Sequence, residues 1–303
     1  MKYIDTHAHM NFAIYDDVRT DIINRTRKDN VTVINIGTQQ DTSTLAVDMA
    51  NQHDHLYAII GLHPIHAVSH FHNHDEVGKD GDEFTSRGEV FDTNFYRELA
   101  ESSDRVVGIG ECGLDYYRNT PEIKVAQEKA FRDQIELALE LDLPLMLHVR
   151  PSENSMDAYH DVLEILREYK VHSSSIHEIN SDEGGRESAL EYKDKGNLRG
   201  QAHFFAGTPE IATEFIELGF YISFTGVITF ASMYEKLVKA IPMDKILSET
   251  DAPYVTPHPF RGQRNEPSHV REVLGKIARI KKIDEPEMVQ QVMENAKRLY
   301  QLI

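Results

Sequence analysis

The chain of 303 residues is poor in cysteine, in long apolar runs and in positive charge, and each shortage excludes a class of protein. Cys112 is the only cysteine, so no disulfide can form within the chain, and we expect a reducing, cytoplasmic location. No apolar stretch approaches the roughly 18 residues that a transmembrane helix needs, so no membrane association is predicted. The chain enters its first apolar run directly, without the basic region and apolar core that mark a signal peptide.

Basic residues are outnumbered by acidic ones, 32 to 50, and the formal net charge is −18. A protein that coats a nucleic-acid backbone without sequence preference carries a basic face, so the charge argues against that class. An enzyme with a locally positive pocket remains possible, because bound divalent metal ions would supply part of the positive charge.

Eight short apolar or β-branched runs, each bounded by turn residues, predict eight strands. They cover residues 3–5, 31–37, 56–62, 105–111, 143–149, 198–205, 220–226 and 245–251. Most of these runs are continuously apolar, which is typical of parallel strands covered by helices. Helical patterns fall between them, so the alternation predicts an α/β fold, a (β/α)8 TIM barrel, as a single domain over residues 1–303.

The clearest helix is predicted over residues 121–142, where Thr120 can cap the first turn and Pro121 suits its first position. Thr208 and Pro209 begin another helix in the same way. A doubly wound open sheet is the structural alternative. No glycine-rich dinucleotide-binding pattern follows the early strands, and this weakens the alternative.

Two polar stretches are predicted to be surface insertions in the barrel, at about residues 66–91 and 173–197. The first is rich in histidine, aspartate, glycine and glutamate, and the second has almost no apolar pattern. Solvated surface loops are the simplest interpretation of both. The histidines of the first insertion also admit a different hypothesis, a metal-binding protein that is not an enzyme.

Polar side chains stand at the ends of the predicted strands, where an α/β barrel gathers its chemistry at one mouth. They are His7, His9, His63, Glu111, His148, His203 and Asp251. Any one of them could be a hydrogen-bonded scaffold residue. Four of these histidines and the two carboxylates together are hard to bury without a cation, and imidazole with carboxylate suits zinc, manganese or iron. Six ligands exceed what one tetrahedral ion needs, so two metal ions are predicted.

The motifs that carry these residues resemble those of the TatD family of metal-dependent DNases, which belongs to the amidohydrolase-like barrels. They are "THAHMNF", "GLHP", "GIGECGLDYYR", "LHVR", "HFFAG" and "SETDAPY", followed by "RGQRNEP". The resemblance covers nearly the whole chain apart from the two insertions. The sequence departs from the family at "HFFAG", where "HCFSG" is common, but it keeps the histidine.

The resemblance implies two divalent metal ions, Zn, Mg or Mn, held by six side chains. The implied ligands are His7, His9 and Asp251 for one ion, His148 and His203 for the other, and Glu111 between the two. Asp251 is the implied general base. The implied activity is cleavage of phosphodiester bonds by a metal-activated water, as a 3′ exonuclease on single-stranded DNA, by a protein that is monomeric and has no stable protein partner.

Side chains that would hold DNA are predicted in the loops of the mouth. His63, Arg118, Arg150 and Arg261 are the candidate phosphate contacts, and Arg264 lies in the same loops. Tyr116 and Tyr117 could stack on a base or pack against the scaffold. A metal-dependent hydrolase of small esters, amides or phosphoesters on the same barrel is the alternative function, because the metals make the nucleophile and the loops select the substrate.

Overall fold

The structure is a computed structural model that describes residues 2–72, 84–117, 120–178 and 196–302. Its core is an eight-stranded sheet in which every pair of neighbouring strands is parallel. In sheet order the strands are β1 (Tyr3–Ala8), β2 (Val31–Ile36), β3 (Leu56–Ile60), β6 (Val106–Asp115), β7 (Leu145–Arg150), β8 (Gly200–Ala202), β9 (Phe220–Phe224) and β10 (Ile246–Ser248). Sheet order equals chain order, as the predicted (β/α)8 barrel requires.

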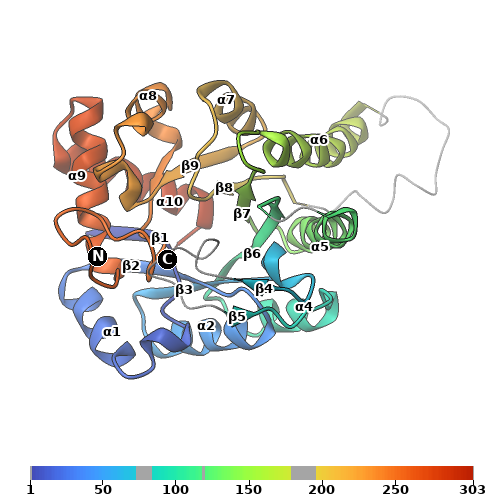
Figure 1. Ribbon diagram of the computed structural model, residues 1–303, viewed down its shortest axis with the longest axis horizontal. Helices are drawn as coiled ribbons and strands as arrows, with labels where there is room; N and C mark the ends of the chain where they lie inside the picture. The colour runs from blue at the N-terminus through green and yellow to red at the C-terminus, as the bar shows by residue number, and fades with distance from the viewer. Residues whose placement is uncertain (1, 73–83, 118–119, 179–195, 303) are drawn as a thin grey trace.

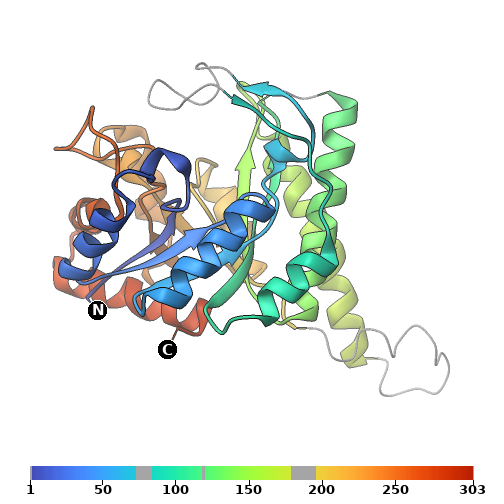
Figure 2. The same ribbon diagram turned by 90° about the horizontal axis from the view of Figure 1, so that it is seen from below.

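Helices pack around the strands, most of them on the outside of the barrel in Figure 1, and α10 lies against one end of it in Figure 2. They are α1 (Arg19–Lys28), α2 (Gln40–Gln52), α4 (Thr93–Glu101), α5 (Pro121–Glu140), α6 (Asp157–Glu178), α7 (Pro209–Glu217), α8 (Glu235–Ala240), α9 (Val270–Lys281) and α10 (Glu285–Tyr300). The predicted helix starts are confirmed, since the hydroxyls of Thr120 and Thr208 accept hydrogen bonds from Ile123 N and Ile211 N. Among the described residues, no helix combines the length and apolar composition that crossing a bilayer requires.

The barrel closes where β1 meets β10, although the backbone ladder between them is short. Ala8 and Ala252 form a single parallel bridge just past the end of β10. Deeper in the barrel, hydroxyl groups replace the ladder: Thr6 Oγ1 donates to Ser248 O at 3.1 Å, and Ser248 Oγ donates to Ile4 O at 3.3 Å. The first and last strands of the chain are therefore joined by side chains as well as by backbone.

The two insertions are only partly within the described residues. In the first, β4 (Phe71–His72) pairs with β5 (Phe84–Thr85) as a small antiparallel sheet, which Figure 2 places on the opposite side of the molecule from α10. Residues 73–83 lie outside the described residues. The second predicted insertion, at 173–197, begins inside helix α6, which continues to Glu178 and so is not a loop at its start. Residues 179–195 lie outside the described part.

Helix α5 positions two of the strand ends through a pair of glutamines that lie two turns apart. Gln134 Oε1 accepts a hydrogen bond from Leu62 N at 2.9 Å, and its Nε2 donates to Leu62 O at 3.0 Å. Gln127 makes the same two-way contact with the backbone of Asp115, at 3.0 and 3.1 Å. Both glutamines are buried. They hold backbone groups just after β3 and at the end of β6.

Replacement of Gln134 by leucine should lower the free energy of unfolding by about 1–3 kcal/mol, because it leaves two buried backbone groups of Leu62 without partners. Urea denaturation would measure the change. The matched control is Gln290→Leu at an exposed position of α10, where the side chain donates to Glu294 one turn along the helix, and a change within about 0.5 kcal/mol is expected. Equal losses in the two variants would contradict the interpretation.

Candidate metal centre

Glu111 lies inside β6 and is 2% exposed. The strand reaches this position because glycines let its backbone come close to β7. A Cβ atom on Gly113 would lie 2.1 Å from His148 O, and Gly113 has a φ of +137° that side chains rarely allow. The pattern "GECG" therefore brings Glu111 against the histidine at the end of the next strand.

Five imidazoles surround the Glu111 carboxylate, and its two oxygens face different sets. Oε2 lies 3.4 Å from His7 Nε2 and 3.7 Å from His9 Nε2. Oε1 faces the other three: His63 Nε2 at 3.4 Å, His148 Nδ1 at 2.9 Å and His203 Nε2 at 3.4 Å. We call these the Oε2 set and the Oε1 set.

The Oε2 set has the dimensions of a metal site. His7 Nε2 and His9 Nε2 lie 3.0 Å apart, and Asp251 Oδ1 lies 3.8 and 3.6 Å from them. Ligands held at about 2.0–2.2 Å in a tetrahedron are about 3.4 Å apart. Two ring nitrogens facing each other across 3.0 Å either share one proton or direct both lone pairs at one cation. The donors around Glu111 Oε2 therefore fit a divalent ion.

The backbone at the barrel seam brings Asp251 to this set. Asp251 N donates to His7 O at 2.9 Å, and His9 N donates to Ala252 O at 2.8 Å. Asp251 has a φ of +56°, a left-handed conformation that aspartate tolerates better than most residues. His9 is oriented from outside the set, where its Nδ1 lies 3.1 Å from Ile36 O.

Two imidazoles of the Oε1 set, those of His148 and His203, have raised pKa values because carboxylates lie next to them. Burial alone lowers the pKa of His148, but hydrogen bonds with Asp115 and Glu111 outweigh it and raise that pKa to about 9. For His203 burial is again outweighed, here by Glu249 and Glu111, and its pKa rises to about 10. Without a metal ion, these carboxylates therefore hold protons on imidazoles at neutral pH. A divalent cation would supply the same compensation.

The remaining groups show the same balance of burial and charge. Burial raises the pKa of Glu111, but the nearby His63, His7 and His203 lower it by more, so this pKa lies well below its ordinary range. Burial lowers the pKa of His9 to about 3, with a further contribution from His7. Asp251 is a carboxyl whose pKa burial raises to about 7. Groups with strongly shifted pKa values in one cluster are typical of a functional site.

The structure brings all six predicted ligands together around Glu111, and His63 with them. Possible metal-holding groups include His7, His9 and Glu111; His7, His203 and Asp251; and His63, Glu111 and His148. His63 is predicted to contact a phosphate rather than a metal ion. The geometry also allows it to be a metal ligand, because its Nε2 is as near Glu111 Oε1 as that of His203. The roles of these residues as ligands stay predictions.

Two buried carboxylates beside the cluster had no predicted role. Asp115 Oδ2 lies 2.9 Å from His148 Nε2, and Glu249 Oε1 lies 3.1 Å from His203 Nδ1. The sequence does hold a signal for both. Asp115 follows Glu111 by four residues on the same face of β6, and Glu249 precedes Asp251 by two residues within the predicted strand 245–251.

The predicted substrate residues are placed less uniformly. The Arg150 guanidinium lies 4.0 Å over the ring of half-exposed Tyr117, and that of Arg261 lies 4.1 Å over Phe230. Arg118 lies outside the described residues. Arg264 is held by the scaffold, because its Nη1 donates to Ile14 O at 2.5 Å.

Two other residues near the site pack into the protein. Tyr116 is buried and donates to Asp161 Oδ2 at 2.8 Å, so packing is its role. Cys112 is buried as well, and burial raises its thiol pKa well above the ordinary value.

Comparison with known proteins gives the family. The family model described as "TatD related DNase" matches residues 4–301. The chain is 36% identical over 301 residues to "Uncharacterized metal-dependent hydrolase YabD" of Bacillus subtilis, with 98% of both chains covered. It is 30% identical over 308 residues to "Uncharacterized metal-dependent hydrolase YcfH" of Escherichia coli, covering 100% of this chain and 97% of that one.

A solved structure agrees in fold. The crystal structure of YjjV, a TatD homologue from Escherichia coli, superposes with a TM-score of 0.76 at 22% identity and covers 100% of this chain and 99% of that one. The class defined by fold and site is a parallel α/β barrel with a histidine–carboxylate cluster at its mouth. The chain belongs to the TatD-related DNase family.

Binding of zinc to the metal-free protein should release protons at neutral pH and should tighten as the pH rises from about 6 to about 8. The reason is that His148 and His203, with pKa values of about 9 and about 10, hold protons there that a metal ion must displace. Titration calorimetry in two buffers of different ionisation enthalpy would count the protons. The same binding heat in both buffers would contradict the prediction.

Proposed function

We propose that this protein is a metal-dependent hydrolase that uses two divalent metal ions to remove nucleotides from the 3′ ends of single-stranded DNA. Membership in the TatD-related DNase family supports the reaction class, and the curated relatives carry the name of metal-dependent hydrolases. The net charge of −18 favours weak binding of a chain end at the mouth over tight coating of a duplex.

The observation that carries the proposal is the division of contacts around Glu111. Its Oε2 faces His7 and His9, and its Oε1 faces His148 and His203, all within 3.7 Å. A carboxylate that presents one oxygen to each of two donor sets is suited to bridge two cations. A non-enzymatic metal store would not need such a bridge. His74, on which that hypothesis partly rested, lies outside the described residues.

When bound, two divalent ions would lower the pKa of a water and offset negative charge on a phosphoryl oxygen. The chain's own groups would do the rest. Asp251 presents Oδ1 to the Oε2 set, and its other oxygen is left to accept the proton of the attacking water. Its pKa of about 7 in the metal-free protein shows how strongly burial favours the protonated form of this carboxyl. Glu111 would contribute one oxygen to each donor set and so fix the position of one set relative to the other.

Two arginine–aromatic pairs support a nucleic-acid substrate. Arg150 is the last residue of β7 and Tyr117 follows β6. Arg261 and Phe230 lie in the loops after β10 and β9, so the two pairs stand on different parts of the mouth. Tyr117 is 40% exposed and Phe230 is 41% exposed. An exposed ring offers a surface on which a base can stack, and a guanidinium beside it offers paired donors to a phosphate.

The first test is degradation of end-labelled single-stranded DNA by the wild type and by Glu111→Ala, each with chelator and with added Mg²⁺, Mn²⁺ or Zn²⁺. Stepwise shortening from the 3′ end is expected in the wild type. The variant should lose at least about 100-fold in rate, because it lacks the carboxylate that both donor sets face.

The control for this test is Glu140→Ala, an exposed glutamate of α5 that pairs with Arg97 on the outside of the barrel. Its rate should stay close to that of the wild type. If a wild-type protein shown to hold two metal ions shortens no DNA but hydrolyses small chromogenic esters, the nuclease proposal fails and the small-substrate alternative stands.

Arg261→Met should raise KM for single-stranded DNA by about tenfold with a smaller change in kcat, because a phosphate contact beside Phe230 is lost while the metal cluster is untouched. Arg97→Met on α4 is the matched control, since Arg97 pairs with Glu140 away from the mouth. Steady-state kinetics at two salt concentrations would measure both parameters. Equal KM values in the two variants would show that Arg261 does not contact the DNA substrate.

A further inference from the structure

Beneath the metal cluster, the interior of the barrel holds a connected group of buried polar side chains. They are Thr6 of β1, Gln201 of β8, Ser223 of β9, Glu249 after β10 and Tyr300 at the end of α10. Each is at most 3% exposed. Polar groups buried this deeply are retained where their hydrogen bonds are complete, so their partners show what the group is arranged to hold.

Glu249 is the acceptor at the centre of this group, and each of its oxygens has two donors. Oε1 accepts from Phe204 N at 2.6 Å and faces His203 Nδ1 at 3.1 Å. Oε2 accepts from Gln201 Nε2 at 2.7 Å and from Ser223 Oγ at 2.8 Å. A backbone N–H and an amide NH2 can only donate, so the carboxylate has to be the acceptor on both sides.

The proton between His203 and Glu249 is therefore carried by the imidazole nitrogen Nδ1. Its other nitrogen, Nε2, faces Glu111 Oε1 at 3.4 Å, inside the metal cluster. A ring nitrogen can bind a metal only through its lone pair. When a proton is held on Nδ1, the proton that a metal ion displaces is the one on Nε2, and the lone pair is then presented there.

We propose that Glu249 is a positioning residue that keeps the proton of His203 on Nδ1 and so holds Nε2 ready as a metal ligand. The inference rests on the metal site of the proposed function, but not on its substrate. It assigns to Glu249 a role toward the metal through His203, without direct contact with the ion.

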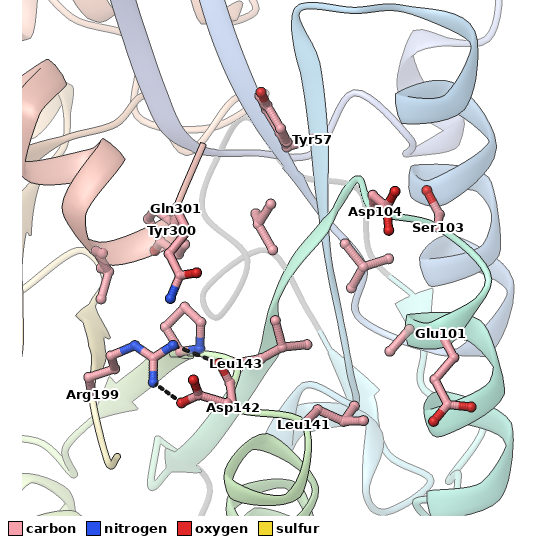
Figure 3. A pocket seen from close by; sticks show the side chains of 15 residues that line it. Tyr57, Glu101, Ser103, Asp104, Leu141, Asp142, Leu143, Arg199, Tyr300 and Gln301 are labelled. Carbon is pink, nitrogen blue, oxygen red and sulfur yellow. Dashed lines mark hydrogen bonds and ion pairs between the residues drawn. The ribbon is translucent and has the colours of Figure 1, made fainter. Parts of the chain in front are cut away.

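The group continues from Glu249 to the far end of the barrel. Tyr300 Oη donates to Gln201 Oε1 at 2.7 Å. Because the Glu249 carboxylate needs a donor, the Gln201 amide turns its Nε2 toward Glu249 and its Oε1 toward Tyr300. Figure 3 shows Tyr300 among the residues that line a cavity of about 420 Å³, together with Tyr57 and Arg199. The last turn of α10 thus supports the orientation of a side chain at the mouth through two hydrogen-bonded neighbours.

The histidines of the Oε2 set are held differently. The Nδ1 atom of His9 faces a backbone carbonyl, and for His7 no partner of Nδ1 is found among the described residues. Carboxylate partners are found on His148 and His203, both of the Oε1 set. The loss of Glu249 should therefore weaken the binding of the metal ion at the Oε1 set, and leave the affinity for the ion at the Oε2 set nearly unchanged.

The test compares Glu249→Gln with Glu249→Leu. Glutamine can keep an oxygen opposite Phe204 N and His203 Nδ1, whereas leucine removes the acceptor at nearly the same volume. Zinc affinity is measured by competition with a chromogenic chelator. We expect one of the two zinc ions to bind about 10–100-fold more weakly in the leucine variant, and less than about fivefold more weakly in the glutamine variant.

A second readout follows the proton itself. In the zinc-loaded wild type labelled with ¹⁵N-histidine, the resonances of His203 are identified by their absence in His203→Gln. A proton on Nδ1 and none on Nε2 is expected. A proton on Nε2 would overturn the proposal even if the leucine variant fails to fold. Loss of both zinc ions to the same degree in the two Glu249 variants would overturn it as well.

Tyr300→Phe and Tyr96→Phe form a matched pair for the support from α10. Each removes one hydroxyl from a buried tyrosine, but Tyr96 donates to Gly61 O, away from Glu249. Only Tyr300→Phe should shift the Nδ1 proton resonance of His203, and equal spectra would remove Tyr300 from the proposal. None of these measurements uses DNA, so a protein without nuclease activity could still satisfy them.

Discussion

The buried carboxylate of Glu111 is the constraint on which the rest of the site depends. An ionised group at 2% exposure is costly unless opposite charge surrounds it. Five imidazoles do so, and they come from the ends of four strands, β1, β3, β7 and β8. The closed parallel barrel brings these strand ends to one mouth. The barrel fold therefore supplies the imidazoles that make an ionised Glu111 tolerable in the interior.

The histidines on the two sides of Glu111 are oriented by different kinds of partner. In the Oε1 set, His148 and His203 each face a further buried carboxylate, Asp115 or Glu249. In the Oε2 set, orientation comes from backbone contacts across the barrel seam, such as Asp251 N to His7 O. A carboxylate partner makes an imidazole more basic and a stronger ligand, whereas a backbone contact fixes position without adding charge. Two ions bound here would differ in how tightly the protein holds them.

Much of this could be predicted from the sequence, because the signals are local. Continuous apolar runs such as "VTVINI" mark buried parallel strands, and Thr120 followed by Pro121 marks a helix start. The predicted ligands follow such runs directly. What could not be predicted depends on contacts between distant segments. Glu249 meets His203 and Tyr300 meets Gln201 only after the barrel has closed, and nothing in the spacing of these residues predicts either contact.

The seam between β1 and β10 also has a consequence for the time at which the protein becomes complete. His7 and His9 lie at the end of the first strand of the barrel and Asp251 follows the last, so the histidines are synthesised long before the aspartate. Until that aspartate emerges, the paired imidazoles have no carboxylate from the final strand to meet. A nascent chain therefore carries the two histidines without this partner while the rest of the barrel is made. Under the proposed two-metal function, an ion at the Oε2 set would gain all of its donors only after Asp251 has been added.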